Sequence, residues 1–300
     1  MKQSNTEINL LNKFPEIKQN VLLAPFTSFK IGGPAKYFYQ VKNNEEARNV
    51  IQFCNNYNFP FFILGNGSNI LISDHGFDGL VVKMENNKII INTDATVYAE
   101  SGVQLQKFIS ELKKNNLTGM EFLVGIPGTI GGAICGNVGT PTKWIDQCIL
   151  NVDYINISNQ VIKIPKSNCK FAYRVSRFKN NDKEIILGAE FSLKKTNTNE
   201  INKLIKNYLN KRTHQPVNQP CAGSIFKNPP GNKAWQLIDN LGLRGKKIGN
   251  AQVSIEHANF IINIGNAKAE DVVILISYIK QQVRDKLRIQ LNEEIKYIGF

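Results

Sequence analysis

The sequence predicts an α+β protein that divides into more than one lobe. Its 300 residues, 42% of them hydrophobic, can bury a substantial core, and chains of this length commonly split into domains. A strand at 36–41, a helix at 45–57 and a strand at 61–64 follow from the hydrophobic pattern near the N-terminus. A further helix at 199–212 precedes two Gln-Pro steps, which indicate a connection into a separate lobe.

The other elements follow from the same two periodicities. In chain order we expect strands at 70–72, 80–84, 89–91 and 96–100, a helix at 103–114, strand character over 151–164 and 185–193, a helix at 234–240, a strand at 259–263 and a helix at 269–288. No internal repeat or low-complexity segment interrupts them.

Composition and charge exclude several classes of protein. The net charge is +13, but the lysines are dispersed and no basic tail or nucleic-acid-reading motif occurs, so a basic surface that attracts anionic nucleotides is the better interpretation. Five cysteines without a Cys-x-x-Cys pair and three scattered histidines predict no disulfide framework and no metal site. The apolar run 272–279 is too short to cross a bilayer and residues 1–14 lack a signal-peptide core, so we expect a cytoplasmic protein.

A short, stiff turn is predicted between Pro220 and Pro229. Proline fixes its own φ and biases the preceding residue towards extended backbone, so the stretch is restricted at both ends. It presents the hydroxyl of Ser224, the ammonium of Lys227 and the carboxamide of Asn228 within five positions. The Ser-x-x-Lys spacing also occurs in acyl-serine enzymes, but their Ser-Asp-Asn and Lys-Thr-Gly partner motifs are absent. A purely structural turn is the simpler alternative.

Two glycine-rich segments are candidate phosphate loops. Segment 65–69 joins two extended runs and opens onto no helix, so it is neither a P-loop nor a Rossmann turn. Its glycines and polar side chains can converge on an anion, and an ordinary Asn-Gly hairpin is the alternative. Segment 125–133 has a predicted helix start at Thr129, where free backbone N–H groups suit a diphosphate. Close packing of that helix at Gly131 and Gly132 is the alternative.

The order of these segments resembles the UDP-N-acetylenolpyruvoylglucosamine reductase family, in its shorter second type. The resemblance spans nearly the whole chain and is carried by segments 27–35, 65–69, 125–128, 173–179, 222–229, 251–254, 257–263 and 294–299. The glycine loops are shared with flavin oxidases of the same fold, whereas the arginine, serine and C-terminal glutamate segments are not. The chain departs from the family pattern at 137–140 and 232–235, and Val175 stands where a polar residue is usual.

The resemblance implies a two-part FAD-binding domain of the vanillyl-alcohol-oxidase type, followed by a smaller α+β substrate-binding domain. The FAD domain would cover residues 1–200, with parts at about 20–80 and 81–200. The substrate domain would cover 201–300, with a C-terminal tail that returns to the FAD domain. The implied cofactor is noncovalent FAD, with NADPH as reductant and UDP-N-acetylglucosamine enolpyruvate as substrate, and we expect a monomer without nucleic-acid or membrane partners.

The resemblance also implies roles for individual residues. Arg174 would hold the substrate carboxylate, Glu294 would stabilise the enol form and Ser224 would donate the proton, with Lys227 one candidate to support the alkoxide. The implied cofactor-binding residues are Gly65, Asn66, Gly67, Ser68, Asn69, Gly125, Ile126, Pro127, Gly128, Thr129 and Gly132, and the substrate-binding residues are Tyr173, Lys227, Asn228 and His257. Two rivals remain, an FAD-dependent oxidase of the same flavin fold and a nucleic-acid-binding protein, which would be colourless and salt-sensitive.

Overall fold

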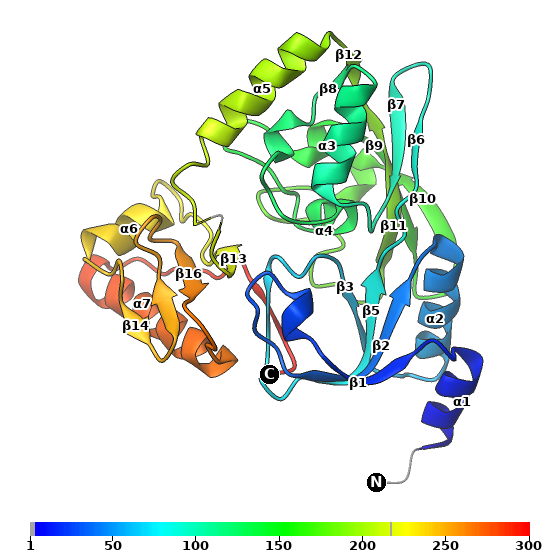
Figure 1. The fold of residues 1–300 in the computed structure, drawn as a ribbon, viewed down its shortest axis with the longest axis horizontal. Helices are drawn as coiled ribbons and strands as arrows, with labels where there is room; N and C mark the ends of the chain where they lie inside the picture. The colour runs from blue at the N-terminus through cyan, green and yellow to red at the C-terminus, as the bar shows by residue number, and fades with distance from the viewer. Residues whose placement is uncertain (1–3, 217) are drawn as a thin grey trace. The chain divides into compact units, whose positions relative to one another are not determined.

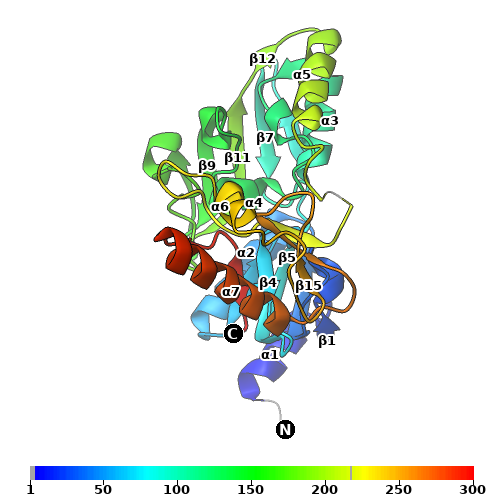
Figure 2. The same cartoon turned by 90° about the vertical axis from the view of Figure 1, so that its left-hand side faces the viewer.

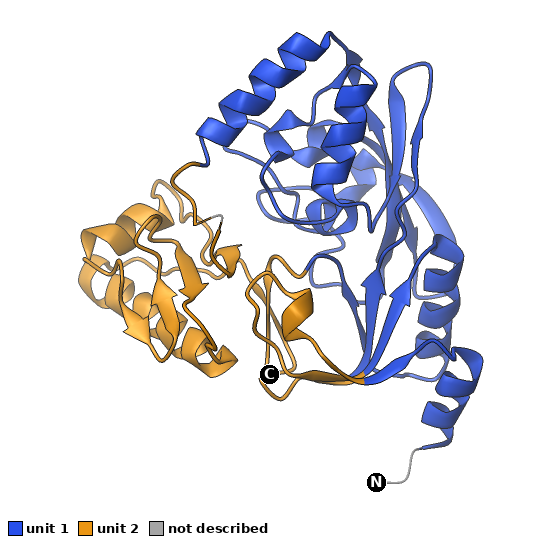
Figure 3. Cartoon of the chain, in the orientation of Figure 1, with its two compact units in different colours: residues 1–19, 37–66, 79–212 blue, residues 20–36, 67–78, 213–300 orange. Residues whose placement is uncertain are grey.

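The computed structural model describes residues 4–216 and 218–300 and divides the chain into two compact units (Figure 3). Unit 1 comprises residues 1–19, 37–66 and 79–212, and unit 2 comprises 20–36, 67–78 and 213–300. Both units mix helices and strands, which confirms the predicted α+β class. Of the N-terminal stretch 1–14 used for the signal-peptide expectation, residues 1–3 lie outside the described part.

The first sheet of the chain has the strand order β1-β2-β5-β3. Its elements and the neighbouring helices are α1 (Asn5–Lys13), β1 (Lys18–Leu22), β2 (Pro34–Val41), α2 (Asn44–Asn56), β3 (Phe61–Leu64) and β5 (Phe77–Met84). Asn43 caps α2 by accepting a hydrogen bond from Glu46 N–H at 2.9 Å, as its position before an amphipathic run predicts. The apolar face of α2, including Val50 and Phe53, packs on this sheet (Figure 1).

The second sheet, β10-β9-β11-β7-β6, is antiparallel and forms the larger part of unit 1. Its strands are β6 (Ile89–Ile91), β7 (Thr96–Glu100), β9 (Ile149–Ile155), β10 (Val161–Pro165) and β11 (Ile185–Ser192). Helices α3 (Leu105–Lys114), α4 (Ile130–Cys135) and α5 (Thr198–Asn210) lie on one side of it, with the short pair β8 (Leu117–Thr118) and β12 (Lys194–Lys195) (Figure 1). The apolar face of α3 buries Phe108 against Phe191, with ring centroids 5.3 Å apart.

Unit 2 is built around the sheet β13-β16-β15-β14. Its strands and helices are β13 (Cys221–Ser224), α6 (Ala234–Asn240), β14 (Lys247–Ile248), β15 (Ala251–Val253), β16 (Phe260–Asn263) and α7 (Ala269–Leu287). Helix α7 packs on β14, β15 and α6, and in Figure 2 it lies below α6. A parallel pair, β4 (Ile70–Ile72) and β17 (Lys296–Ile298), joins the 67–78 segment to the C-terminal tail. The Asp74 carboxylate accepts from the first N–H of α7, Ala269, at 2.8 Å.

Most predicted elements agree with the structure to within two or three residues, and the differences have clear causes. Residues 151–164 form two strands, β9 and β10, that pair as a hairpin. The hairpin alternative for segment 65–69 is wrong, because β3 pairs with β5 and β4 pairs with β17. Strand β17 was not predicted, since three residues carry too little periodicity to identify a strand.

The side chain of Asn86 offers a test of how unit 1 is held together. It is fully buried, and its Nδ2 donates to Asn44 Oδ1 at 2.7 Å and Leu187 O at 3.2 Å, while its Oδ1 accepts from Gly102 N–H at 2.9 Å. Asn86→Ala leaves these groups buried and unpaired, so we expect a loss of about 2–4 kcal/mol in the free energy of unfolding.

Urea denaturation measures this loss, with the exposed neighbour Asn87→Ala as the control that changes stability by less than about 0.5 kcal/mol. Equal effects of the two substitutions would contradict the interpretation.

Candidate active site

The first glycine segment, 65–69, contains one position that only glycine can occupy. Gly67 has a φ of +61°, and a β-carbon there would lie 2.4 Å from the carbonyl oxygen of Phe26. Its own carbonyl accepts from Ser28 N–H at 3.0 Å. Segment 27–35, which also carries the family resemblance, therefore packs directly against this loop within unit 2.

The second glycine segment, 125–132, leads into α4, whose cap is Thr129 as predicted. The first amides of α4 are already used: Ile130 N–H donates to Val103 O and Gly131 N–H donates to Ser101 O. Thr129 Oγ1 accepts from Gly132 N–H at 3.3 Å. The expectation that free amides at this helix start face a diphosphate is thus wrong for these three residues. Gly131 follows the packing alternative, since its β-carbon would lie 2.8 Å from Ser101 Cβ.

The two glycine segments meet inside unit 1. A β-carbon on Gly65 would lie 2.8 Å from Thr129 Oγ1, so the start of the first loop lies against the cap of α4. Gly132, in the first turn of that helix, is exposed. Gly65 therefore makes room for Thr129, whereas Gly132 leaves backbone uncovered at the surface of unit 1, where a cofactor such as FAD can approach closely.

Arg174 lies in a tight turn of unit 1. Ala172 and Val175 exchange two backbone hydrogen bonds of 3.0 and 3.1 Å, which places Tyr173 and Arg174 at the tip. Arg174 has a φ of +56°, a left-handed conformation that non-glycine residues adopt at a cost of about 1–3 kcal/mol. Lys179 Nζ donates to the Arg174 carbonyl at 3.0 Å. Strain of this kind is typical of residues that a function requires in a fixed position.

Two side chains bind the Arg174 turn to the C-terminal end of α4. Asn137 Nδ2 donates to Ala172 O at 3.0 Å, and Ser176 Oγ donates to Cys135 O at 2.7 Å. Asn137 is buried with a φ of +41°, which asparagine tolerates better than most residues. The cap of α4 and the Arg174 turn are therefore attached to opposite ends of one short helix.

The Arg174 guanidinium has aromatic and cationic neighbours in unit 1. Its Cζ lies 5.7 Å from the ring centroid of Trp144 and 5.9 Å from that of Tyr173, within range of cation–π attraction. Burial, together with repulsion from Arg174, lowers the pKa of Arg212. Arg212 also packs on the second glycine segment, because its Cδ lies 3.2 Å from the position of a Gly125 β-carbon. Sequence reasoning missed Arg212, since a lone arginine at a helix end has no signal of its own.

Ser224 and Glu294 belong to unit 2, which brings their backbones together. Ser224 ends β13 and pairs with Phe260 of β16, after Gly223 at a φ of +75°. Glu294 N–H donates to the carbonyl of Ile225, the residue after Ser224, at 2.7 Å. Two predicted catalytic residues from segments 70 positions apart thus lie in adjoining stretches of chain.

Asn69 of the first glycine segment is bonded to the same C-terminal stretch. Its Nδ2 donates to Glu294 O at 3.2 Å, and its own carbonyl accepts from Lys296 N–H at 3.0 Å. The side chain and the carbonyl of this predicted cofactor residue are therefore both hydrogen-bonded to the main chain of the stretch that carries Glu294, within unit 2. Their neighbourhood is fixed by the β4–β17 pairing, which the sequence did not reveal.

The predicted substrate-binding residues have different structural settings. Asn228 Oδ1 accepts from Ala234 N–H at 2.9 Å, so its carboxamide oxygen caps α6. Lys227 is half-buried, and its N–H donates to Asn292 O at 2.8 Å. His257 lies between Phe260 and Trp235, with ring centroids 4.8 and 6.0 Å away. Trp235, one of the departures from the family pattern, is thus a neighbour of a predicted substrate-binding residue.

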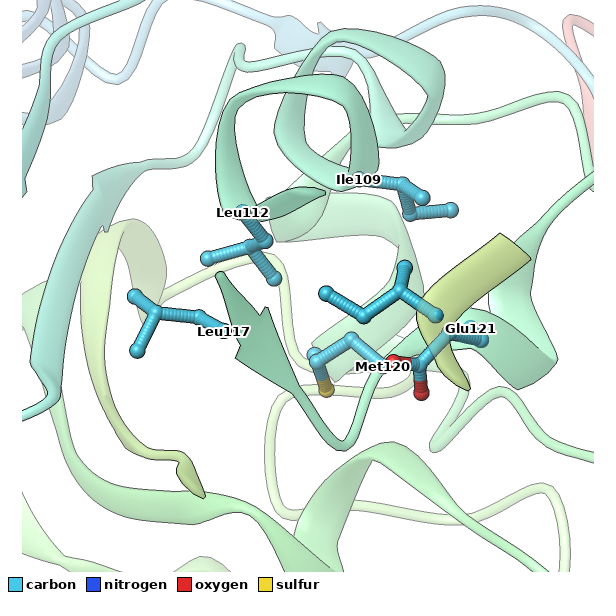
Figure 4. A pocket seen from close by; sticks show the side chains of 6 residues that line it. Ile109, Leu112, Leu117, Met120 and Glu121 are labelled. Carbon is cyan, nitrogen blue, oxygen red and sulfur yellow. The ribbon is translucent and has the colours of Figure 1, made fainter. Parts of the chain in front are cut away.

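A small apolar hollow in unit 1 contains none of the predicted site residues. It is lined by Ile109, Leu112, Leu117, Met120, Glu121 and Ile201 (Figure 4). Glu121 uses one oxygen, Oε2, to accept from Gly119 N–H at 3.0 Å. We attribute the hollow to packing between α3, β8 and α5.

Comparisons with known proteins agree with the geometry. Residues 35–164 match the family described as FAD binding domain, and residues 215–298 match UDP-N-acetylenolpyruvoylglucosamine reductase, C-terminal domain. The chain is 42% identical over 292 residues to the UDP-N-acetylenolpyruvoylglucosamine reductase of Chlamydia felis, with 96% of each chain covered. The corresponding protein of Carboxydothermus hydrogenoformans is 42% identical over 285 residues, with 94% of each covered. The crystal structure of the Thermus caldophilus reductase superposes with a TM-score of 0.81 at 30% identity, covering 93% of this chain and 98% of that one.

The fold and the matched domains define a flavoprotein oxidoreductase with an FAD-binding domain and a second α+β domain. Among the helices within 4–216 and 218–300, none has the length and apolar character to cross a membrane. The chain belongs to the UDP-N-acetylenolpyruvoylglucosamine reductase family.

His257 should make the stability of the protein depend on pH. Burial, and secondarily the nearby Arg244 guanidinium, lower the pKa of His257, while Asp239 acts weakly in the opposite direction. In the unfolded chain the pKa returns to about 6.5, so the unfolded state takes up the proton first as the pH falls. The stability is therefore fully present above pH 6.5 and is lost progressively below it.

The variant His257→Gln lacks this titrating group. Its melting temperature should therefore decrease less between pH 7 and pH 5 than that of the unaltered protein, even if the substitution also changes the melting temperature at pH 7. The exposed His214 provides the control, because His214→Gln should keep the slope of the unaltered protein. An unchanged slope in His257→Gln would mean that another group causes the pH dependence.

Proposed function

We propose that this protein catalyses the NADPH-driven reduction of UDP-N-acetylglucosamine enolpyruvate to UDP-N-acetylmuramate, as a cytoplasmic monomer. The observation that carries the proposal is the hydrogen bond from Glu294 N–H to Ile225 O, because it brings the proton-donor turn and the C-terminal glutamate segment together. Neither segment is needed merely to bind a flavin. The order of segments and the two matched domains support the same reaction.

The reduction adds a hydride to C3 and a proton to C2 of the enolpyruvyl ether, which becomes a lactyl ether. Bound FAD supplies the hydride transfer, with NADPH as the source of electrons. The cofactor is bound by the two glycine segments, with Gly65, Gly125, Gly128 and Thr129, next to the exposed Gly132 of α4. Ser224 Oγ donates the proton to C2. Its backbone pairs with Phe260 of β16, and Glu294 bonds to the next residue, Ile225, so the main chain that carries the hydroxyl is held in place before reaction.

Charge flows into the substrate carboxylate when the hydride arrives, and Arg174 and Glu294 stabilise that charge. A guanidinium can hold both carboxylate oxygens with parallel hydrogen bonds. The left-handed backbone of Arg174 and the bond from Lys179 to its carbonyl hold the main chain of the turn, and the guanidinium lies within cation–π range of the Trp144 ring. Glu294, with a shared proton, hydrogen-bonds the enol oxygen. Tyr173, Lys227, Asn228 and His257 bind the remaining oxygens of the nucleotide substrate.

Arg174→Lys should reduce kcat by roughly 10²–10³, the usual effect of losing one donor to a developing anion. A lysine provides a point charge and cannot reproduce the bidentate contact, so substrate binding should survive better than turnover. Steady-state kinetics with NADPH and the enolpyruvyl nucleotide separates kcat from KM.

The matched control is Arg177→Lys, in the same segment. Arg177 Nε donates to Glu184 Oε2 at 2.9 Å, so its replacement should lower the melting temperature while kcat stays close to that of the unaltered enzyme. If Arg174→Lys kept the kcat of the unaltered enzyme, Arg174 would have no part in the mechanism.

Ser224→Ala should separate the two halves of the reaction and thereby tests the proposed function directly. NADPH should still bleach the bound flavin at close to the normal rate, because the glycine loops are unchanged. Reoxidation by UDP-N-acetylglucosamine enolpyruvate should slow by roughly 10²–10⁴, the effect of losing a positioned general acid. Stopped-flow absorbance follows both steps.

A purified protein without FAD that cannot be reconstituted would contradict the proposal. So would reoxidation of the unaltered enzyme by oxygen alone, with no dependence on the enolpyruvyl nucleotide, which is the behaviour of an oxidase. If Ser224→Ala slowed both steps equally, Ser224 would be a structural residue of its turn.

A further inference from the structure

We infer that Asn259 is a positioning residue of the reaction. Its side chain fixes the stretch of chain directly after Ser224, and that same stretch is hydrogen-bonded to Glu294. The inference rests on the proposed function and adds a residue that touches neither substrate nor cofactor. Asn259 immediately precedes β16, is only 5% exposed, and belongs to the same unit as Ser224 and Glu294.

The carboxamide of Asn259 forms the pair of hydrogen bonds with Phe226 that a residue of a neighbouring strand would form. Its Oδ1 accepts from Phe226 N–H at 3.0 Å, and its Nδ2 donates to Phe226 O at 2.8 Å. The backbone carbonyl of Asn259 also accepts from Ile225 N–H at 2.9 Å. One residue thus satisfies three of the four backbone polar groups of Ile225 and Phe226, directly after Ser224.

Side-chain bonding is needed here because the backbone pairing of β13 with β16 is irregular. Cys221 pairs with Ile262 and Ser224 pairs with Phe260, so the register shifts between them, and Gly223 has a φ of +75°. A bulge of this kind re-aims the side chain that follows it. After the bulge, the side-chain amide of Asn259 makes the hydrogen bonds to Phe226 that regular strand pairing would otherwise make.

The opposite edge of the same segment carries the catalytic glutamate stretch. Ile225 O accepts from Glu294 N–H at 2.7 Å, Lys227 N–H donates to Asn292 O at 2.8 Å, and Phe226 bridges to Glu293. Residues 225–227 therefore lie between Asn259 on one side and residues 292–294 on the other. A displacement of Phe226 would move the backbone on which both Ser224 and Glu294 depend.

Asn263 provides an internal comparison on the same strand. It is also a buried asparagine, 7% exposed, and its Nδ2 donates to Phe29 O at 3.1 Å. Its Oδ1 accepts from Gly265 N–H at 2.9 Å and Ala267 N–H at 3.0 Å. The side chains of the two asparagines therefore make similar numbers of buried hydrogen bonds, but of these two side chains only that of Asn259 bonds to residues 225–227.

The experiment compares Asn259→Ala with Asn263→Ala in stopped-flow half-reactions of the FAD-loaded enzyme. Both substitutions should lower the melting temperature, because each leaves buried backbone groups unpaired. Only Asn259→Ala should slow flavin reoxidation by the enolpyruvyl nucleotide, by roughly 10–100-fold, since small misplacements of reacting groups cost about that much. Reduction by NADPH should stay within about twofold in both variants.

Asn259→Asp gives a second, pH-dependent readout and serves if the alanine variant does not fold. A protonated carboxyl can accept from Phe226 N–H and donate to Phe226 O as the amide does, whereas the ionised form repels the carbonyl. The reoxidation rate of Asn259→Asp relative to the unaltered enzyme should therefore rise as the pH falls. A purely structural role of Asn259 predicts no such recovery in the relative rate.

The outcomes separate the two hypotheses. If the unaltered enzyme shows no reoxidation by the enolpyruvyl nucleotide, the proposed function fails and this inference falls with it. If the unaltered enzyme is active but Asn259→Ala keeps its reoxidation rate, slows both half-reactions equally, or slows reoxidation no more than Asn263→Ala does, Asn259 is not a positioning residue while the proposed function stands. A pH-independent relative rate in Asn259→Asp would also overturn the inference.

Discussion

The hydrogen bond between Glu294 N–H and Ile225 O is the constraint on which the arrangement of unit 2 depends. It joins the end of the chain to the turn after Ser224, and the neighbouring β17 strand pairs with β4 from the N-terminal third of the sequence. Because these are backbone bonds, they position the two stretches without using the hydroxyl of Ser224 or the carboxyl of Glu294.

In unit 1, a short helix and the side chains bonded to it position the predicted functional segments. The short helix α4 has a glycine segment and the Thr129 cap at its start, and the Arg174 turn is bonded to its end through Asn137 and Ser176. The first amides of α4 are used by the neighbouring chain, so the helix contributes shape and rigidity more than free N–H groups. The cost of the left-handed backbone at Arg174 is offset by this tight attachment.

Several asparagine side chains form hydrogen bonds with backbone groups that are not paired within a β-sheet. Asn86 in unit 1 and Asn259 in unit 2 each pair with several buried backbone groups, and Asn69 joins a glycine loop to the Glu294 stretch. The chain is rich in asparagine, and at these three positions the asparagine side chain has a defined structural role. An amide is suited to them because it donates and accepts at once, which neither a carboxylate nor an aliphatic side chain can do.

The sequence by itself determined the α+β class, the positions of most helices and strands, the cap at Thr129 and the segments that carry the family resemblance, because these depend on local periodicity and residue type. Only the tertiary structure decided that the main chain of Glu294 bonds to both Ile225 and Asn69, that the Asn259 side chain bonds to Phe226, and that the amides at the start of α4 are occupied. These facts depend on pairing between segments up to 225 positions apart. Such pairing leaves no periodic pattern in the chain, since it is set by the register of strands and the packing of turns.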